Sequence, residues 1–202
     1  PVSGVAFIAG YLINGALPDP AAGAAACMTA FGAPAFAWGA LVNLAGMLLN
    51  PFGFFALFAD IGARAPSRAA TGAMIASVLG VAMVLAGYGV IAFDLPLLGR
   101  LARQGLAPAE LGLVVATSPL LVGFMLLAGL AYSLGSLLFA VALWRGRLSP
   151  GWVAVALTLS ALLLCFGPPL PGPALWPGLL GAALLAVSGG WIARHECQMH
   201  GD

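Results

Sequence analysis

The chain has 202 residues, of which 62% are hydrophobic and only 6% are charged, and its formal net charge is +1. A soluble domain carries about 25% charged residues, so this composition excludes an ordinary soluble fold. It indicates one all-α, polytopic integral membrane bundle, a single membrane domain over residues 1–202. The few positive charges, all of them arginine, do not form the basic surface that binding of nucleic acid requires.

The first apolar segment covers residues 2–17, which is slightly short for a membrane span. Pro18 and Pro20 follow it, and proline cannot continue a helix from its predecessors. A signal-peptide core is the alternative, but the segment lacks a basic flank and a convincing cleavage site. We therefore expect a transmembrane helix whose first turns are missing or were processed away, followed by a connection or short helix over residues 21–31.

The second predicted span covers residues 33–59 and carries small and amide side chains at helical spacing. On a helix they fall within a sector of about 80°. The other faces are apolar, so we expect lipid outside and this sector against other helices. We call it the glycine–asparagine stripe, and it consists of Gly39, Asn43, Gly46, Asn50 and Gly53. It is predicted to be a helix-packing face or the lining of a solute path.

Pro51 lies inside the same span, directly after Asn50. A proline removes one backbone donor and leaves the carbonyl of Met47 without its usual partner, so a kink is expected. The Asn50 amide is a candidate to satisfy that carbonyl.

The third predicted span covers residues 70–93, and its small residues Gly72, Ala76, Gly80 and Gly87 also share one face. Residues 94–118 form the longest connection. Within it, residues 95–104 read as an amphipathic helix in the membrane interface, with leucines toward acyl chains and Arg100 and Arg103 toward head groups. Glu110 follows Pro108, and this pair predicts another helical turn.

The remaining predicted spans cover residues 119–144, 150–166 and 174–193, with a proline-rich loop over 167–173 and a solvated tail over 194–202. Six spans place most arginines on one side, namely Arg64, Arg68, Arg145, Arg147 and Arg194. Only Arg100 and Arg103 lie on the other side. The positive-inside bias then predicts both termini in the cytoplasm, with the chain in a bacterial inner membrane. Four spans with two re-entrant segments fit the arginines less well.

The middle of each predicted span lacks Asp, Glu, Arg and His. Proton-coupled carriers and voltage sensors need ionisable groups there, and haem-bearing subunits usually place histidines on their helices. Ser133 sits in a Tyr-Ser-Leu-Gly-Ser run suggestive of an intramembrane serine protease. Such an enzyme needs a histidine at membrane depth, and both histidines follow the last span. No catalytic residue is assigned.

The remaining candidate ligands are sulfur and imidazole groups. His195, Cys197 and His200 are plausible ligands for a soft metal, but their spacing matches no closed four-ligand site, so no metal site is predicted. Cys27 and Cys165 both fall on the predicted outer side. They are read as small buried thiols, and a disulfide between them is the open alternative.

The sequence names no reaction and no specific cofactor. We expect a non-catalytic multi-pass membrane protein: an accessory, assembly or scaffold subunit that packs against partner helices, lipids or hydrophobic cofactors, or that self-associates. The alternative is a carrier or channel for a neutral or lipophilic solute, with Asn43, Asn50 and the Pro51 kink along its path.

Overall fold

The computed structural model describes residues 1–15, 23–64, 67–166 and 175–199, and this part of the chain is helical without strands. The side chains of Leu113 and of residues 196–199 are not described. The α-helices are α1 (Val2–Asn14), α2 (Ala24–Phe31), α3 (Pro34–Arg64), α4 (Arg68–Gly89), α5 (Leu95–Arg103), α6 (Ala109–Ala116), α7 (Pro119–Arg145), α8 (Gly151–Phe166) and α9 (Leu175–Met199).

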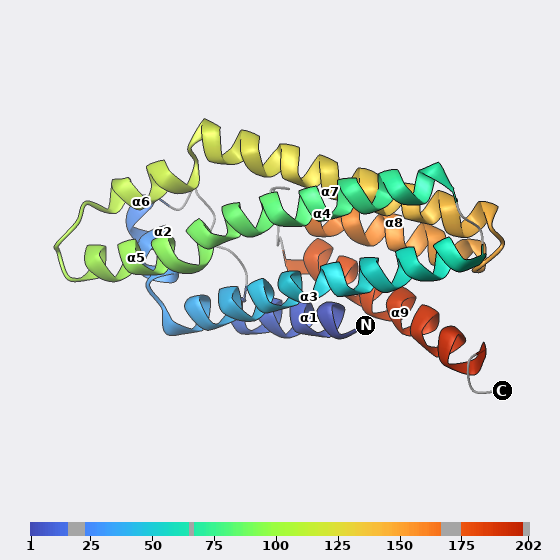
Figure 1. The fold of residues 1–202 in the computed structure, drawn as a ribbon. Coiled ribbons are helices and arrows are strands. Elements are labelled where there is room, and N and C mark those ends of the chain that lie inside the picture. Colours follow the sequence, from blue (N-terminus) through green and yellow to red (C-terminus); the bar gives the residue numbers. More distant parts are fainter. Residues whose placement is uncertain (16–22, 65–66, 167–174, 200–202) are drawn as a thin grey trace.

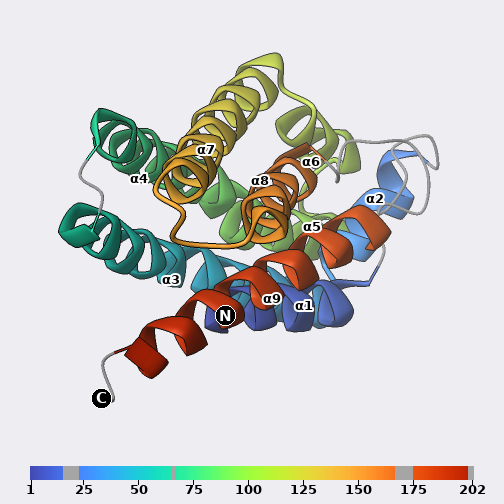
Figure 2. The ribbon, with the colours of Figure 1, turned by 90° about the vertical axis from the view of Figure 1, so that its right-hand side faces the viewer.

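Six of these helices form a closed ring. Consecutive members run in opposite directions along one axis, and each packs on the next in the order α1, α3, α4, α7, α8, α9 and back to α1 (Figures 1 and 2). By length and apolarity, four helical stretches suffice to cross a membrane: α3, α4 with α5, α6 with α7, and α9. α1 and α8 are shorter, with 13 and 16 residues. The six predicted spans thus correspond to six ring helices, of which four have spanning length.

Local sequence explains several helix ends. The Ser67 hydroxyl accepts a 3.2 Å hydrogen bond from the Ala70 N–H and so caps α4. Pro119 stands in the first turn of α7, where a missing N–H costs nothing. α9 continues to Met199, so the helix extends into the segment after residue 193 that was expected to be a solvated tail.

The helix that contains the third predicted span does not stop at residue 93. A π-helical turn, Val90–Asp94, joins α4 to α5 in one stretch from Arg68 to Arg103. Its 36 residues amount to about 54 Å at 1.5 Å per residue, against about 30 Å of bilayer hydrocarbon. α5 matches the extent of the predicted amphipathic segment, but it runs on from α4 instead of turning aside (Figure 1).

Three short helices, α2, α5 and α6, form a cap at one end of the ring. Their core is a separate cluster that includes Met28, Phe31 and Leu95. Gly32 and Gly99 let α2 and α5 touch, since a Cβ on Gly99 would lie 2.7 Å from Gly32 Cα. Arg103, expected to reach lipid head groups, donates through Nη1 to the Gly32 carbonyl at 3.3 Å. Cys27 belongs to this cap, whereas Cys165 packs on the main core.

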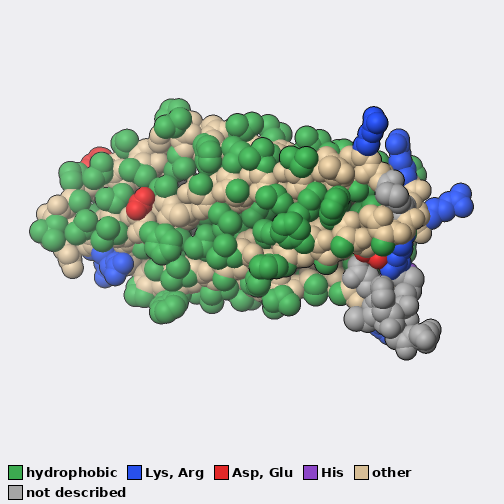
Figure 3. Space-filling view, in the orientation of Figure 1, with side chains coloured by type: hydrophobic (Ala, Val, Ile, Leu, Met, Phe, Trp, Pro, Cys, Tyr) green, Lys and Arg blue, Asp and Glu red, His purple; other side chains and the backbone are tan. Residues whose placement is uncertain are grey.

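Apolar side chains cover the long sides of the bundle, and charges gather at its two ends (Figure 3). Exposed side chains include Trp38, Phe52 and Leu120, at 65%, 70% and 83% of their full accessibility. A soluble monomer rarely exposes so much contiguous apolar surface, so the surface suits a membrane. We call the end that carries Arg64, Arg68, Arg145, Arg147 and Arg194 the arginine-rich end.

Candidate functional site

The glycine–asparagine stripe faces α1 of the same chain over most of its length. A Cβ on Gly39 would lie 2.7 Å from the Gly10 carbonyl oxygen, and one on Gly46 would lie 3.2 Å from both Ala6 Cβ and the Ser3 carbonyl oxygen. The backbones of α1 and α3 therefore meet at these glycines. Gly53 differs, because open space surrounds the place of its missing Cβ.

Each of these two helices places an asparagine side chain against a glycine of the other helix: Asn43 of α3 against Gly10, and Asn14 of α1 against Gly39. A side chain on Gly10 would run into the Asn43 amide oxygen, and one on Gly39 would run into the Asn14 amide oxygen. The glycine Cα hydrogens thus point at amide oxygens, the geometry of weak C–H···O hydrogen bonds. Asn43 is 1% exposed, and its amide has no conventional hydrogen-bond partner within the described ranges. Its amide oxygen lies against Gly10 of α1, in the interface between the two helices.

Asn50 makes a different set of contacts, toward the ring's centre. Its amide nitrogen donates to the Tyr132 hydroxyl at 2.9 Å, and its amide oxygen accepts from the Ser3 hydroxyl at 3.3 Å. All three side chains are buried. We call Ser3, Asn50 and Tyr132 the central polar bridge, because it ties α1, α3 and α7 together.

The amide of Asn50 was a candidate partner for the Met47 carbonyl. Its bonds go instead to Tyr132 and, at 3.9 Å, to the Met47 sulfur. α3 stays helical through Pro51 to Arg64. The Asn50 amide, which was expected to bond to the Met47 carbonyl freed by Pro51, thus belongs to the central polar bridge.

Aromatic rings fill the ring's interior next to the central polar bridge. Phe54 stacks on Phe139 with centroids 5.4 Å apart and planes 5° apart, and it meets Tyr132 edge-on at 5.8 Å. Phe54 and Phe139 are almost completely buried. The interior is thus a packed core at this level.

The small residues of α4 pack on α7 in the same way that the stripe packs on α1. A Cβ on Gly80 would lie 2.6 Å from Tyr132 Cα, and one on Gly135 would lie 2.6 Å from the Ser77 backbone nitrogen. The close approach at Gly80 fixes the backbone of Tyr132 and so aims its hydroxyl at Asn50. The sequence analysis missed Ser3. Tyr132 was one of several polar residues on the predicted spans that could form hydrogen bonds between helices, and nothing in the sequence distinguished it from the others.

Of the three candidate metal ligands, His195 can be placed. Its ring stacks on Trp191 with centroids 4.9 Å apart. The Cys197 side chain and His200 lie outside what the structure describes. Within the described ranges, His, Cys, Asp and Glu form no group of three or more able to hold a metal ion.

The chemistry available at the central polar bridge is hydrogen bonding by an amide and two hydroxyls. Comparison with protein-family models, with curated proteins and with solved structures finds no match to this chain. Any functional proposal is therefore supported by the geometry of the chain alone.

Proposed function

We propose that this chain is a six-span, non-catalytic integral membrane protein that serves as an accessory or scaffold subunit. The observation that carries the proposal is the packed interior of the ring, where Phe54, Phe139 and the central polar bridge occupy the space between helices. Because the interior of the bundle is filled, its interactions must take place on the apolar outer surface. That surface can contact lipids, partner helices or a second copy of the chain.

The six-span layout is part of this proposal. α1 and α8 are short for a span, but each lies between two other ring helices, which fits an antiparallel bundle of six. A tilt, a locally thin bilayer or flanking interfacial residues accommodate short helices at modest cost. The arginine-rich end then faces the cytoplasm of a bacterial inner membrane, together with both termini.

A matched pair of variants tests the accessory role. Gly53 on α3 and Gly123 on α7 both have open space around the place of a Cβ, so leucine at either position adds bulk only to the outer surface. We expect native purification from the membrane to recover another membrane subunit at fixed stoichiometry. If α3 carries the docking face, Gly53→Leu lowers that stoichiometry and Gly123→Leu does not.

Recovery of the chain alone and as a monomer, in mild detergent and at native expression levels, would contradict the accessory role. The thermal midpoints of both variants serve as the control, because neither leucine meets another helix of this chain. A large drop in either midpoint would show that the variant disturbs the bundle itself.

A carrier or channel for a neutral solute is the second candidate, and the central polar bridge favours it. Neutral solutes need hydrogen-bonding groups but no charge, and the Asn50–Tyr132 bond crosses the interior of a ring of six helices. Opening that bond would be the gating step. Swelling of proteoliposomes in glycerol or urea measures such a flux, which Asn50→Leu should change and Asn43→Leu should not.

A further inference from the structure

The arginine-rich end contains an open hollow that neither proposed role uses. It has a volume of about 500 Å³ and lies between α9 and the turn that joins α7 to α8. Six residues matter to its chemistry: Trp144, Arg147, Ser149, Gly151, Trp191 and His195. A narrower space beside it is also lined by Ser149, Trp191 and His195 and reaches Asp60 and Arg64.

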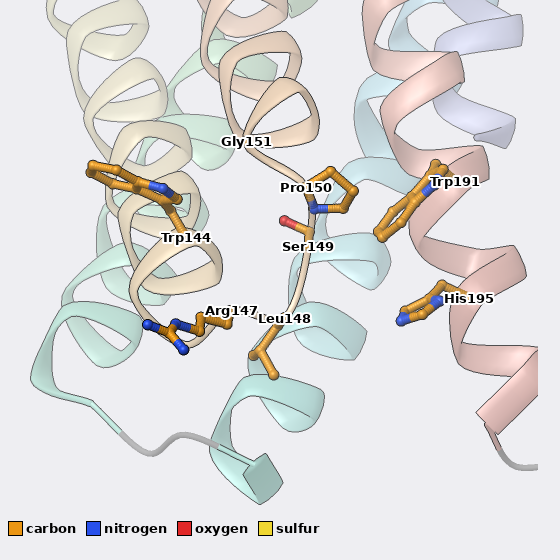
Figure 4. Close-up of a pocket in the computed structure, with 8 residues that line it drawn as sticks. All are labelled: Trp144, Arg147, Leu148, Ser149, Pro150, Gly151, Trp191 and His195. Carbon is orange, nitrogen blue, oxygen red and sulfur yellow. The ribbon is translucent and has the colours of Figure 1, made fainter.

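The lining side chains are layered along the bundle axis. Figure 4 shows the rings of Trp144 and Trp191 level with the start of α8, while Arg147 and His195 lie nearer the end of the bundle. Indole rings favour the boundary between acyl chains and head groups, and cations favour the phosphate level outside it. The order of groups in the hollow is therefore the order of groups in a phospholipid.

Arg147 has an unusual backbone. Its φ is 54°, and within the described ranges it is the only residue other than glycine with a positive φ. This left-handed conformation ends α7, with the Leu148 N–H bonded to the Leu143 carbonyl at 3.0 Å. Glycine is the usual residue there, because a side chain makes the conformation strained. An arginine kept at a strained position points to a use for its side chain.

The charges around the hollow favour an anion. Arg147 is exposed and has no ion-pair partner within the described ranges, and the Ser149 hydroxyl oxygen is buried without a hydrogen-bond partner there. The first N–H groups of α8 start at Gly151, where the helix dipole adds partial positive charge. The nearby carboxylate, Asp60, forms an ion pair with Arg64 on the next turn of α3, which offsets its charge.

We infer that this hollow binds the head group of an anionic glycerophospholipid from the leaflet at the arginine-rich end. The phosphate sits within reach of Arg147, the Ser149 hydroxyl and the start of α8, and the acyl chains run past Trp144 and Trp191 along the apolar side of the bundle. The site needs only a membrane-embedded chain, so it is independent of the accessory and carrier roles.

The test measures lipid binding to the purified full chain by native mass spectrometry. The probes are dioleoylphosphatidylglycerol and, as the neutral lipid, dioleoylphosphatidylcholine. We expect the anionic lipid to bind more tightly, and Arg147→Gln to weaken it about fivefold. Arg68→Gln is the matched control, because Arg68 is exposed at the same end but does not line the hollow; its lipid affinity should stay unchanged.

Arg147→Gly separates binding from folding. It removes the cation and the backbone strain together, so lipid affinity should fall while the thermal midpoint stays level or rises. Equal weakening by Arg68→Gln and Arg147→Gln would show diffuse surface attraction and overturn the site. Displacement of the lipid by millimolar glycerol 3-phosphate would show that a soluble phosphoester suffices, and would overturn the assignment to a lipid.

Discussion

The side-chain amide of Asn50 donates a 2.9 Å hydrogen bond to the hydroxyl of Tyr132, and this bond joins α3 to α7 across the interior of the ring. Asn43, two turns earlier on α3, places its amide oxygen against Gly10 of α1 and forms no conventional hydrogen bond with the described residues. Two asparagines seven residues apart on one stripe thus differ in role: Asn43 fills a helix interface, and Asn50 holds the centre of the bundle.

Asn50→Leu should therefore destabilise the bundle more than Asn43→Leu. The first substitution leaves the Tyr132 hydroxyl buried without its partner, which costs about 1–3 kcal/mol. The second removes an amide without hydrogen bonds, and its cost comes from fitting a branched side chain against Gly10. Thermal midpoints in one detergent compare the two variants. A larger loss with Asn43→Leu would contradict the prediction.

A double-mutant cycle isolates the Asn50–Tyr132 bond. We expect Asn50→Leu and Tyr132→Phe to be non-additive by about 0.6–1.7 kcal/mol, values that run from the average to the maximum found for side-chain hydrogen bonds between membrane helices. Ser77→Ala on α4, combined with Asn50→Leu, is the matched control, because the structure gives Ser77 no hydrogen bond to Asn50. Additivity of Asn50→Leu with Tyr132→Phe would mean that the bond adds nothing to stability.

The glycines of the stripe provide a second comparison. A methyl group on Gly39 would lie 2.7 Å from the Gly10 carbonyl oxygen, whereas one on Gly53 meets nothing within 4 Å. Gly39→Ala should thus cost about 1–3 kcal/mol through overpacking. Gly53→Ala should be neutral or stabilise by up to about 1 kcal/mol, since alanine is the better helix former. The thermal midpoints of the two variants are compared. Equal midpoints would show that Gly39 lies on the outer surface of the bundle and not against α1.

These contrasts show what the sequence could predict. Seven-residue spacing placed Gly39, Asn43, Gly46 and Asn50 on one face, because the period of a helix is fixed by its backbone. The spacing could not reveal which helix covers that face. α1 covers it, and α1 contributes its own glycine at position 10, opposite Asn43. Gly53 has the same spacing but lies beyond the contact between α1 and α3. Periodicity placed it on the packing face, although no other helix of this chain covers it there.

The helix continues past the predicted end of the third span for a local reason. The predicted connection began at Asp94, the first charged residue after a long apolar segment. The π-helical turn Val90–Asp94, whose wider turn bonds the Leu95 N–H to the Val90 carbonyl, instead carries the helix on into α5. The hollow at the other end depends on the backbone of Arg147, and a positive φ at arginine has no signature in a single sequence.

Membrane topology can be tested with a reporter that is active only in the cytoplasm. The distribution of arginines predicts activity for a fusion after Asp202 and none for a fusion within residues 167–173. A fusion after Gly146, in the turn between α7 and α8, should also be active. The reverse pattern would contradict the orientation, and activity at all three sites would contradict the six-span layout.

The cap of α2, α5 and α6 depends on a close backbone contact. Its helices touch through backbone at Gly32 and Gly99, where a Cβ on Gly99 would lie 2.7 Å from both Gly32 Cα and the Met28 carbonyl oxygen. Gly99→Val should therefore separate α5 from α2 and break the 3.3 Å bond from Arg103 to the Gly32 carbonyl.

The expected result is faster proteolysis of the segment between α5 and α6. In the proposed orientation this segment faces the periplasm, so protease added to intact spheroplasts reports it directly. Leu97→Ser is the matched control, because Leu97 lies on the same helix but is about half exposed; its cleavage rate should stay near that of the unaltered chain. Resistance of Gly99→Val equal to that of the unaltered chain would show that the Gly32–Gly99 contact does not hold the cap.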